Sequence, residues 1–302
     1  MNKKVAQAFG SGYTGVYMNI FSPTRLKELC SQYDLSPSKE YGQNYLISEK
    51  PIRAMIEDGP VTSTDTIVEI GPGFGVLTLA LAPLVKNVVA FEIEKKLEKY
   101  WEEKMAEHKN IEIVWGNAIY KWEEHVSDLK KFTVIANLPY QITSHILRLI
   151  LESNYKPEQV IVMVQKEVAE RICAKPGDMS LLAVSVQLYG DPKVICKVSR
   201  GSFWPSPKVD SAVLSIKIHK ENQPTGWLTH GSKNPSLDER AFFDMVRAGF
   251  SHPRKQLWSN LSKVFADKDW KSLLQEVVGN EKARAQELSV EDWKQLLITS
   301  GL

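Results

Sequence analysis

No run of apolar residues in this chain approaches the ~20 that a membrane-spanning helix needs, so we expect no membrane segment. The first fifteen residues, MNKKVAQAFGSGYTG, begin with lysines but contain no apolar stretch. We therefore expect no secretory signal and a cytoplasmic protein. The cysteines Cys30, Cys173 and Cys196 form no CxxC pair. This pattern indicates reduced thiols rather than a disulfide framework or a zinc site.

The histidines form no HxH or HxxxH pair, so we expect no metal site. A strong net charge of either sign is also lacking. The formal net charge is +2 and the sequence pI is about 8.2, whereas a nucleic-acid-binding domain often has a pI above ~9. If nucleic acid binds, the positive charge must be concentrated locally. The length of 302 residues, with 43% hydrophobic and 25% charged, is typical of a soluble protein with one large domain and a small one.

Short apolar runs recur between residues 44 and 218, separated by amphipathic segments of helical length. The runs are TIVEI (66–70), NVVAFEI (87–93), IEIVWG (111–116), FTVIANL (132–138) and QVIVMVQ (159–165). Continuous apolar runs of this length are typical of strands buried on both faces of a parallel sheet. Their alternation with helical segments predicts an α/β fold with a doubly wound sheet.

The pattern changes after residue 187. Residues 191–219 resemble two strands around a loop rich in proline and serine, and we expect them to form an antiparallel pair at the edge of the sheet. Residues 220–236 have the composition of a linker, and from Leu237 onward only short helices are predicted. At the other end, residues 1–40 look peripheral, with a loosely docked helix over residues 24–34.

Serines next to proline or acidic residues predict where several helices begin, because their hydroxyl groups accept hydrogen bonds from first-turn amides. The predicted starts are Ser22 before Pro23, Ser236 with Glu239, and Ser289 before Glu291 and Asp292.

Glycines gather in VEIGPGFGVLTLALA (68–82), after the first sheet strand, where they allow a tight turn and a close approach to a ligand. A dinucleotide fingerprint would need a third glycine at the position of Val76, following Gly71 and Gly73. The chain also lacks a G-x-x-x-x-G-K-[ST] phosphate loop. The sequence therefore lacks both of these motifs for binding a pyrophosphate group.

Polar residues follow the next two strands. Glu92 ends the second strand, where an acidic side chain can accept hydrogen bonds from ribose hydroxyls. Asn117 follows the third strand, where an amide can contact an adenine edge. A glycine loop with these two residues and no pyrophosphate device favours S-adenosylmethionine. The alternatives are that Glu92 is a helix-cap charge and Asn117 a turn residue.

The buried strand 132–138 runs into Asn137-Leu138-Pro139-Tyr140. An adenine amine is a poor nucleophile because its lone pair is delocalised into the ring. The Asn137 side chain and the Leu138 carbonyl could accept its two N–H groups and localise that lone pair, while Pro139 restricts Leu138 to extended conformations. Tyr140 offers a face on which the base can stack. The alternative is an ordinary Asx-Pro turn with a packed tyrosine.

With these motifs, the chain resembles the ribosomal RNA adenine N6,N6-dimethyltransferases, and specifically their small-subunit (16S) branch. The matching segments are YGQNYL (41–46), EIGPGFGVLT (69–78), NLPY (137–140), MVQKEVAERI (163–172), FWPSPKVDSAVL (203–214) and VRAGFSHPRKQL (246–257). The resemblance implies a Rossmann-like class I S-adenosylmethionine-dependent methyltransferase with a small α-helical C-terminal domain. We expect an extension (1–40), a methyltransferase domain (41–220), a linker (221–236) and a helical domain that binds RNA (237–302).

The resemblance also implies roles for individual residues. The catalytic set would be Asn137, Leu138, Pro139, Tyr140 and Phe203, with Phe203 stacking on the flipped target base opposite Tyr140. The methyl donor would be held by Asn44, Leu46, Gly71, Gly73, Glu92, Ile93, Asn117, Ala118 and Asn137, without a metal, and would leave as S-adenosylhomocysteine. RNA phosphates would be met by Arg247, Arg254 and Lys255. The implied partner is small-subunit rRNA in an immature ribosomal subunit, and we expect a monomer.

Two positions depart from the family pattern. Asn117 stands where members usually have Asp, and Pro253 replaces one of two adjacent arginines; these changes bear on donor affinity and on RNA binding. The alternatives are the large-subunit methylases of macrolide resistance, which share the NLPY-type turn, and a non-catalytic ribosome-assembly or transcription factor on the same fold. The motifs at 203–214 and 249–257 favour the small-subunit branch, and the intact turn argues against a factor that has lost catalysis.

Overall fold

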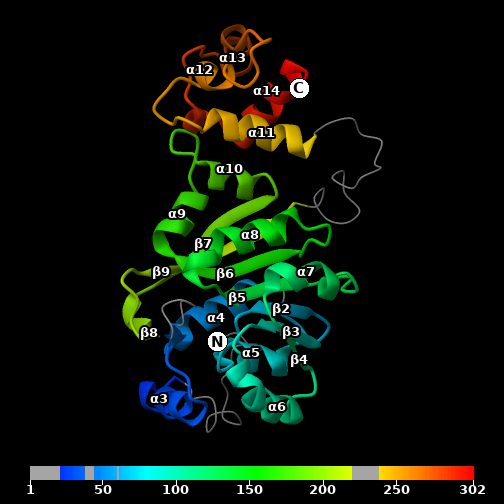
Figure 1. The fold of residues 1–302 in the computed structure, drawn as a ribbon, viewed down its shortest axis with the longest axis vertical. Helices are drawn as coiled ribbons and strands as arrows, with labels where there is room; N and C mark the ends of the chain where they lie inside the picture. Colours follow the sequence, from blue (N-terminus) through cyan, green and yellow to red (C-terminus); the bar gives the residue numbers. More distant parts are fainter. Residues whose placement is uncertain (1–20, 38–43, 60, 220–237) are drawn as a thin grey trace. The chain divides into compact units, whose positions relative to one another are not determined.

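The computed structural model describes residues 21–37, 44–59, 61–219 and 238–302, which form two units (Figure 1). The first unit contains the described residues up to Ala169 together with Lys193–Ile218, and the second contains Glu170–Pro192 and the described residues from His219 onward. The second unit thus includes a segment within the predicted methyltransferase domain. The predicted boundaries at residues 40 and 221–236 lie outside the described residues.

A seven-stranded sheet forms the centre of the first unit, with the strand order β4-β3-β2-β5-β6-β9-β7. The strands are β2 (Thr66–Ile70), β3 (Asn87–Glu92), β4 (Ile111–Trp115), β5 (Thr133–Asn137), β6 (Gln159–Gln165), β7 (Gly190–Val198) and β9 (Ser211–Ile218). The strands from β4 to β6 are parallel, and β9 runs antiparallel to β6. The five predicted parallel strands and the extra pair at the sheet edge are confirmed.

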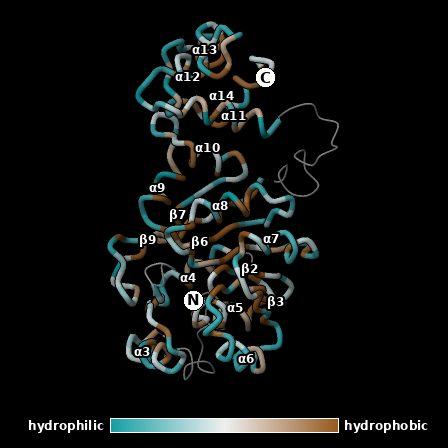
Figure 2. Tube along the Cα trace, in the orientation of Figure 1, coloured by the Kyte–Doolittle hydropathy of each residue, from teal (hydrophilic) through white to brown (hydrophobic). Residues whose placement is uncertain are grey.

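The strand order reverses between β2 and β5, because β3 and β4 follow on one side of β2 whereas β5 and β6 follow on the other. In doubly wound sheets, ligands bind outside the carboxyl ends of the strands at such a reversal. The parallel strands are mostly apolar (Figure 2), with Val68, Val134 and Val160 fully buried. This burial stabilises the platform that carries the strand ends.

Helices follow most strands of the first unit, and a short ribbon joins two distant segments. The helices are α3 (Pro23–Gln32), α4 (Glu49–Asp58), α5 (Val76–Leu81), α6 (Glu98–Glu107), α7 (Ala118–Val126), α8 (Thr143–Glu152) and α9 (Lys166–Ile172), with short 3-10 turns η1 (Ala82–Leu84), η2 (Lys95–Leu97), η3 (Tyr140–Ile142) and η4 (Arg200–Ser202). The ribbon pairs β1 (Tyr45–Leu46) with β8 (Phe203–Trp204).

Helix α3 begins as predicted, with Ser22 as its cap and Pro23 as its first residue. The expectation of a loosely docked helix was wrong. Leu26 is fully buried in the main core cluster, and Lys96 donates a 2.8 Å bond to the carboxylate of Asp34 just beyond the helix. Burying Leu26 alone is worth roughly 1.5–3 kcal/mol, so this helix is part of the core.

The second unit is helical over most of its described residues. It contains α10 (Leu181–Gln187), α11 (Glu239–Gly249), α12 (Leu257–Leu261), α13 (Trp270–Val278), η6 (Ala285–Glu287) and α14 (Val290–Ser300). The capping box of Ser289 with Asp292 is confirmed at the start of α14. Ser236 lies outside the described residues, and the residue that caps α11 is Asp238, whose carboxylate accepts from the amides of Arg240 and Ala241.

The helices of the second unit close over large aromatic residues, since Trp270, Trp293 and Phe242 have at most 1% of their surface exposed. The amides of Gly177 and Met179 both donate to the carbonyl of Gln286, which ties residues 170–192 to this unit. Among the described helices, none is long and apolar enough to cross a membrane. Cys30, Cys173 and Cys196 are not joined in disulfides.

Candidate active site

The loop between β2 and α5 carries the predicted glycines in left-handed backbone conformations, which residues with side chains adopt at a cost. Gly71 has φ 73° and Gly75 has φ 77°. A Cβ atom on Gly75 would lie 2.8 Å from the Trp101 ring, whereas one on Gly71 would meet nothing within 4 Å. Gly75 is therefore needed for internal packing, while the open side of Gly71 leaves room for a ligand.

Glu92, at the end of β3, is directed at this glycine loop. One carboxylate oxygen accepts a 3.0 Å bond from the amide of Gly73, and the other accepts a 2.8 Å bond from the amide of Glu94. The residue is 5% exposed. Burial raises the pKa of the Glu92 carboxyl, and the backbone amides oppose that rise. Each oxygen keeps a lone pair that a ribose hydroxyl could use.

Glu69, in β2, is a second buried carboxyl that the sequence reasoning missed. It is 1% exposed, and its carboxyl accepts a 2.7 Å hydrogen bond from the Thr78 hydroxyl. Burial raises its pKa to about 8, and the negative charge of Glu92 adds to the rise. A lone acid inside the apolar run TIVEI was the signal that could have found it.

The predicted catalytic turn begins with Asn137, the last residue of β5, at the carboxyl ends of the parallel strands. The amide of Leu138 donates a 3.1 Å bond to the Met163 carbonyl of the neighbouring strand, which fixes the Asn137–Leu138 segment. The Pro139 carbonyl accepts from the Thr143 hydroxyl at 3.2 Å. The Tyr140 hydroxyl lies 2.6 Å from the hydroxyl of Ser211, a buried residue of β9. Burial raises the pKa of Tyr140, so its phenol is neutral at physiological pH.

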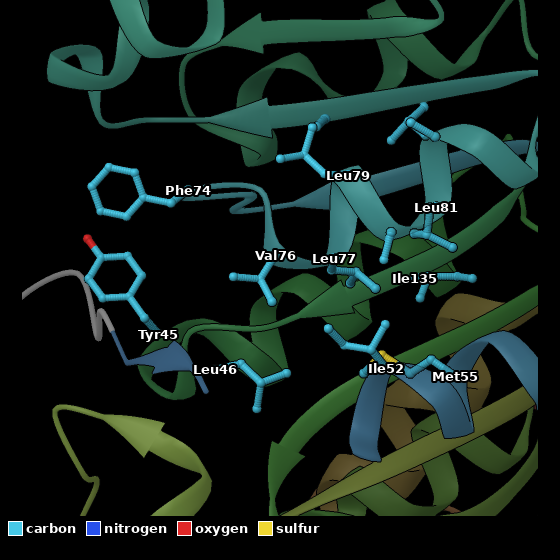
Figure 3. Close-up of a cluster of buried hydrophobic side chains, with 14 of the residues drawn as sticks. Tyr45, Leu46, Ile52, Met55, Phe74, Val76, Leu77, Leu79, Leu81 and Ile135 are labelled. Atoms are coloured by element: carbon cyan, nitrogen blue, oxygen red, sulfur yellow. The ribbon is translucent and has the colours of Figure 1, made fainter. Parts of the chain in front are cut away.

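These elements meet in one cavity at the carboxyl ends of β2, β3 and β5, which we call the strand-end cavity. Most of the predicted site residues line it: Asn44, Leu46, Gly71, Gly73, Glu92, Ile93, Asn137, Leu138, Pro139 and Tyr140. Glu69 lines it as well, with apolar side chains that include Tyr45, Met55, Phe74 and Val76 (Figure 3). The cavity therefore combines an apolar wall with two carboxyls and two side-chain amides.

Three of the predicted catalytic and donor-binding residues do not line the strand-end cavity. Asn117 and Ala118 lie at the start of α7, where the Asn117 side-chain oxygen accepts a 2.9 Å bond from the amide of Ile119 and caps the helix. Phe203, in β8, is 3% exposed and pairs in register with Leu46. Its ring is a core residue here, not an exposed stacking surface. The roles of Asn117, Ala118 and Phe203 toward ligands remain predictions.

The predicted RNA-binding residues belong to the second unit. Arg247, on α11, is about half exposed and forms a 2.7 Å ion pair with Asp244. Arg254 and Lys255 are exposed in the turn between α11 and α12. Within the described residues, no group of three or more His, Cys, Asp or Glu side chains is placed to hold a metal ion.

Residues 35–300 match the ribosomal RNA adenine dimethylase family. The chain belongs to this family. It is 37% identical to the ribosomal RNA small subunit methyltransferase A of Dehalococcoides mccartyi, over 90% of this chain and 91% of that protein. It is 34% identical to the protein of the same name from Lactiplantibacillus plantarum, over 91% and 94% of the two chains.

Solved structures agree on the fold. A dimethyladenosine transferase from Plasmodium falciparum superposes with a TM-score of 0.69 at 24% identity, covering 84% of this chain and 96% of that one. The 23S rRNA methyltransferase ErmE superposes with a TM-score of 0.64 at 25% identity, covering 85% and 99%. The predicted family, the α/β methyltransferase fold class and the enzyme class are thereby confirmed. Family membership also implies S-adenosylmethionine as the methyl donor.

Proposed function

We propose that this chain transfers methyl groups from S-adenosylmethionine to the N6 amines of adenosines in the RNA of the small ribosomal subunit. The observation that carries the proposal is the strand-end cavity, where the turn of Asn137 to Tyr140 faces the same space as the glycine loop and Glu92. The names of the relatives from D. mccartyi and L. plantarum support the small subunit as the substrate.

The donor fits the residues that line the strand-end cavity. Its ribose hydroxyls would donate to Glu92, and its methionine end would lie against the open side of Gly71, with Asn44 and Leu46 closing over it. The Glu92 carboxylate gives the cavity negative potential, which suits a ligand that carries a sulfonium and an ammonium group. When bound, S-adenosylmethionine supplies an electrophilic methyl group on positively charged sulfur and leaves as S-adenosylhomocysteine.

The chain itself prepares the target amine. The Asn137 side-chain oxygen and the Leu138 carbonyl accept its two N–H groups, which localises the nitrogen lone pair toward the methyl donor. Nitrogen gains positive charge as the new bond forms, and both oxygens stabilise that charge. Their positions are set before the substrate binds, because the Leu138 amide is hydrogen-bonded to the Met163 carbonyl and Pro139 restricts the backbone conformation of Leu138.

RNA binding would involve both units. Tyr140 offers a stacking face in the strand-end cavity, while Arg247, Arg254 and Lys255 would meet phosphates from the second unit. Phe203 could serve as a second stacking partner only if its ring became exposed. We further propose that the substrate is an immature small subunit in the cytoplasm and that the protein acts as a monomer.

The test is methylation of defined substrates. The full chain is incubated with labelled S-adenosylmethionine and either unmodified small subunits or large subunits, and the RNA is digested to nucleosides. We expect labelled N6,N6-dimethyladenosine from the small subunit alone. Because ErmE is a structural neighbour, the competing function is methylation of the large subunit. Label found only there would overturn the proposed substrate, and no label in either would support the non-catalytic alternative.

A further inference from the structure

A second cavity of the first unit, which we call the lysine cavity, has a lining opposite in character to the strand-end cavity. Three lysines from separate elements line it: Lys50 of α4, Lys166 at the start of α9 and Lys197 of β7. Asp210 is the one carboxylate in its lining, and this group already accepts a 2.9 Å bond from the amide of Arg200. The balance of charge favours an anion.

The start of α4 adds neutral hydrogen-bond donors to the lysine cavity. Ser48 is the cap of this ten-residue helix, but its side chain makes no capping bond. First-turn amides have no partner within their own helix, and the helix dipole places positive potential there; in α4 they are those of Glu49 and Lys50, because Pro51 has no N–H. Ser48 and Lys50 line the cavity, while the nearby Glu49 carboxylate is bonded to Arg53 at 2.7 Å. Amides, a hydroxyl and ammonium groups together are suited to a phosphate.

One hydrogen bond links the lining of the lysine cavity to the lining of the strand-end cavity. Ser211 lines the lysine cavity, and Tyr140 lines the strand-end cavity. Their hydroxyl oxygens are 2.6 Å apart. A nucleotide carries its base and its phosphate on the same sugar. A base stacked on Tyr140 would therefore have backbone phosphates near the lysine cavity.

We propose that the lysine cavity binds a backbone phosphate of the substrate RNA beside the target adenosine, and that Lys50 and Lys197 hold it there. This inference rests on the proposed function, because the ligand is the RNA whose base enters the strand-end cavity. The phosphate would anchor the flipped nucleotide while the base is positioned between Tyr140 and the donor. Such a contact is independent of sequence, so it supplies affinity and orientation rather than recognition of the base.

The test compares the Lys50→Gln/Lys197→Gln variant with Lys86→Gln, which removes an exposed lysine of the same unit that does not line either cavity. Binding to unmodified small subunits is measured over a series of salt concentrations. Methyl transfer and calorimetric affinity for S-adenosylhomocysteine are measured beside it. We expect the double variant to bind the subunit roughly tenfold more weakly, since the loss of a hydrogen bond between charged groups lowers affinity by about this factor. The slope of log affinity against log salt should fall by about 0.7–0.9, the value of one lost phosphate contact.

The controls separate the possible failures. Lys86→Gln should behave like the wild type, and Lys50→Arg/Lys197→Arg should restore most of the affinity because it keeps the charge. If the double Gln variant and Lys86→Gln have the same salt slope while the wild type methylates the RNA, the phosphate site is overturned and the proposed function stands. Loss of S-adenosylhomocysteine binding in the double variant would also overturn it, since the lysines would then support the strand-end cavity. A wild type that binds S-adenosylhomocysteine but methylates no RNA would refute the proposed function itself.

Discussion

Replacing Glu69 with Gln should make the protein more stable, and increasingly so as the pH rises. The pKa of Glu69 is raised from 4.5 to about 8 because the residue is buried, with Glu92 nearby. In the unfolded chain the pKa of this carboxyl is the ordinary value of 4.5. Between these two pH values the folded state holds a proton that the unfolded state has released. Stability is therefore lost progressively as the pH rises from about 4.5 to about 8.

The magnitude follows from the pKa difference. At ~1.4 kcal/mol per tenfold change in proton affinity, the full penalty is on the order of 5 kcal/mol above pH 8. At pH 6 a large part of this penalty is still absent, because most of the folded protein keeps Glu69 protonated. Glu69→Gln removes the charge and keeps an oxygen that can accept from the Thr78 hydroxyl. Its gain in unfolding free energy over the wild type should thus grow by on the order of 2–3 kcal/mol between pH 6 and pH 9.

The assay is urea unfolding of both proteins at pH 6 and pH 9 without ligand. Glu112→Gln is the matched control, because Glu112 is a glutamate in β4 of the same sheet whose side chain is exposed. A gain that is equal at both pH values would refute the reasoning. Titration with S-adenosylmethionine at pH 9 adds a second measurement: wild-type Glu69 is ionised at this pH, so the variant should bind the cationic donor more weakly, although it is more stable.

Four further changes test the remaining assignments. Asn137→Ala should reduce single-turnover methylation on the order of 10²-fold, far more than it reduces donor affinity; a rate near wild type would contradict its role as an acceptor. Phe203→Ala should destabilise the fold by roughly 3–5 kcal/mol in urea unfolding, because the ring is a core residue; unchanged stability would show that the ring can leave the core. Asn117→Asp should bind S-adenosylhomocysteine about fivefold more tightly, corresponding to about 1 kcal/mol, and unchanged affinity in calorimetry would leave it a helix cap alone. The Arg254→Gln/Lys255→Gln variant should weaken small-subunit binding in a salt-dependent way, and a salt-independent effect would point to a structural role.

The sheet could be predicted because burial on both faces leaves a direct trace in sequence. The run at 159–165 is apolar at five consecutive positions, which matches β6, with those five positions fully buried. The β1–β8 ribbon leaves no such trace, since two residues have no periodicity. The docking of α3 was underestimated for a related reason. Leu26 and Leu29 are ordinary helical residues until the surface that covers them is known.

The site was predictable wherever it lies at the ends of strands. Glu92 and Asn137 meet because parallel strands place their carboxyl ends at one edge of the sheet. Glu69 was missed because it lies inside a strand, where its chemistry depends on burial rather than on position in a motif. Asn117 was assigned by its place after the third strand and Phe203 by its place in a family motif, and the structure gives both of them internal partners.

The two cavities explain how a chain of nearly neutral charge can handle two oppositely charged ligands. Among the described residues, no basic side chain lines the strand-end cavity, which instead holds the carboxyls of Glu69 and Glu92. The lysine cavity has the opposite balance. On these proposals, a cationic methyl donor would be attracted to the strand-end cavity and an anionic RNA backbone to the lysine cavity, and the Tyr140 and Ser211 hydroxyls link the two linings. A net charge of +2 for the chain hides this separation because the charges cancel in the sum. If each ligand is attracted by its own cavity, adding salt should weaken RNA binding much more than S-adenosylhomocysteine binding.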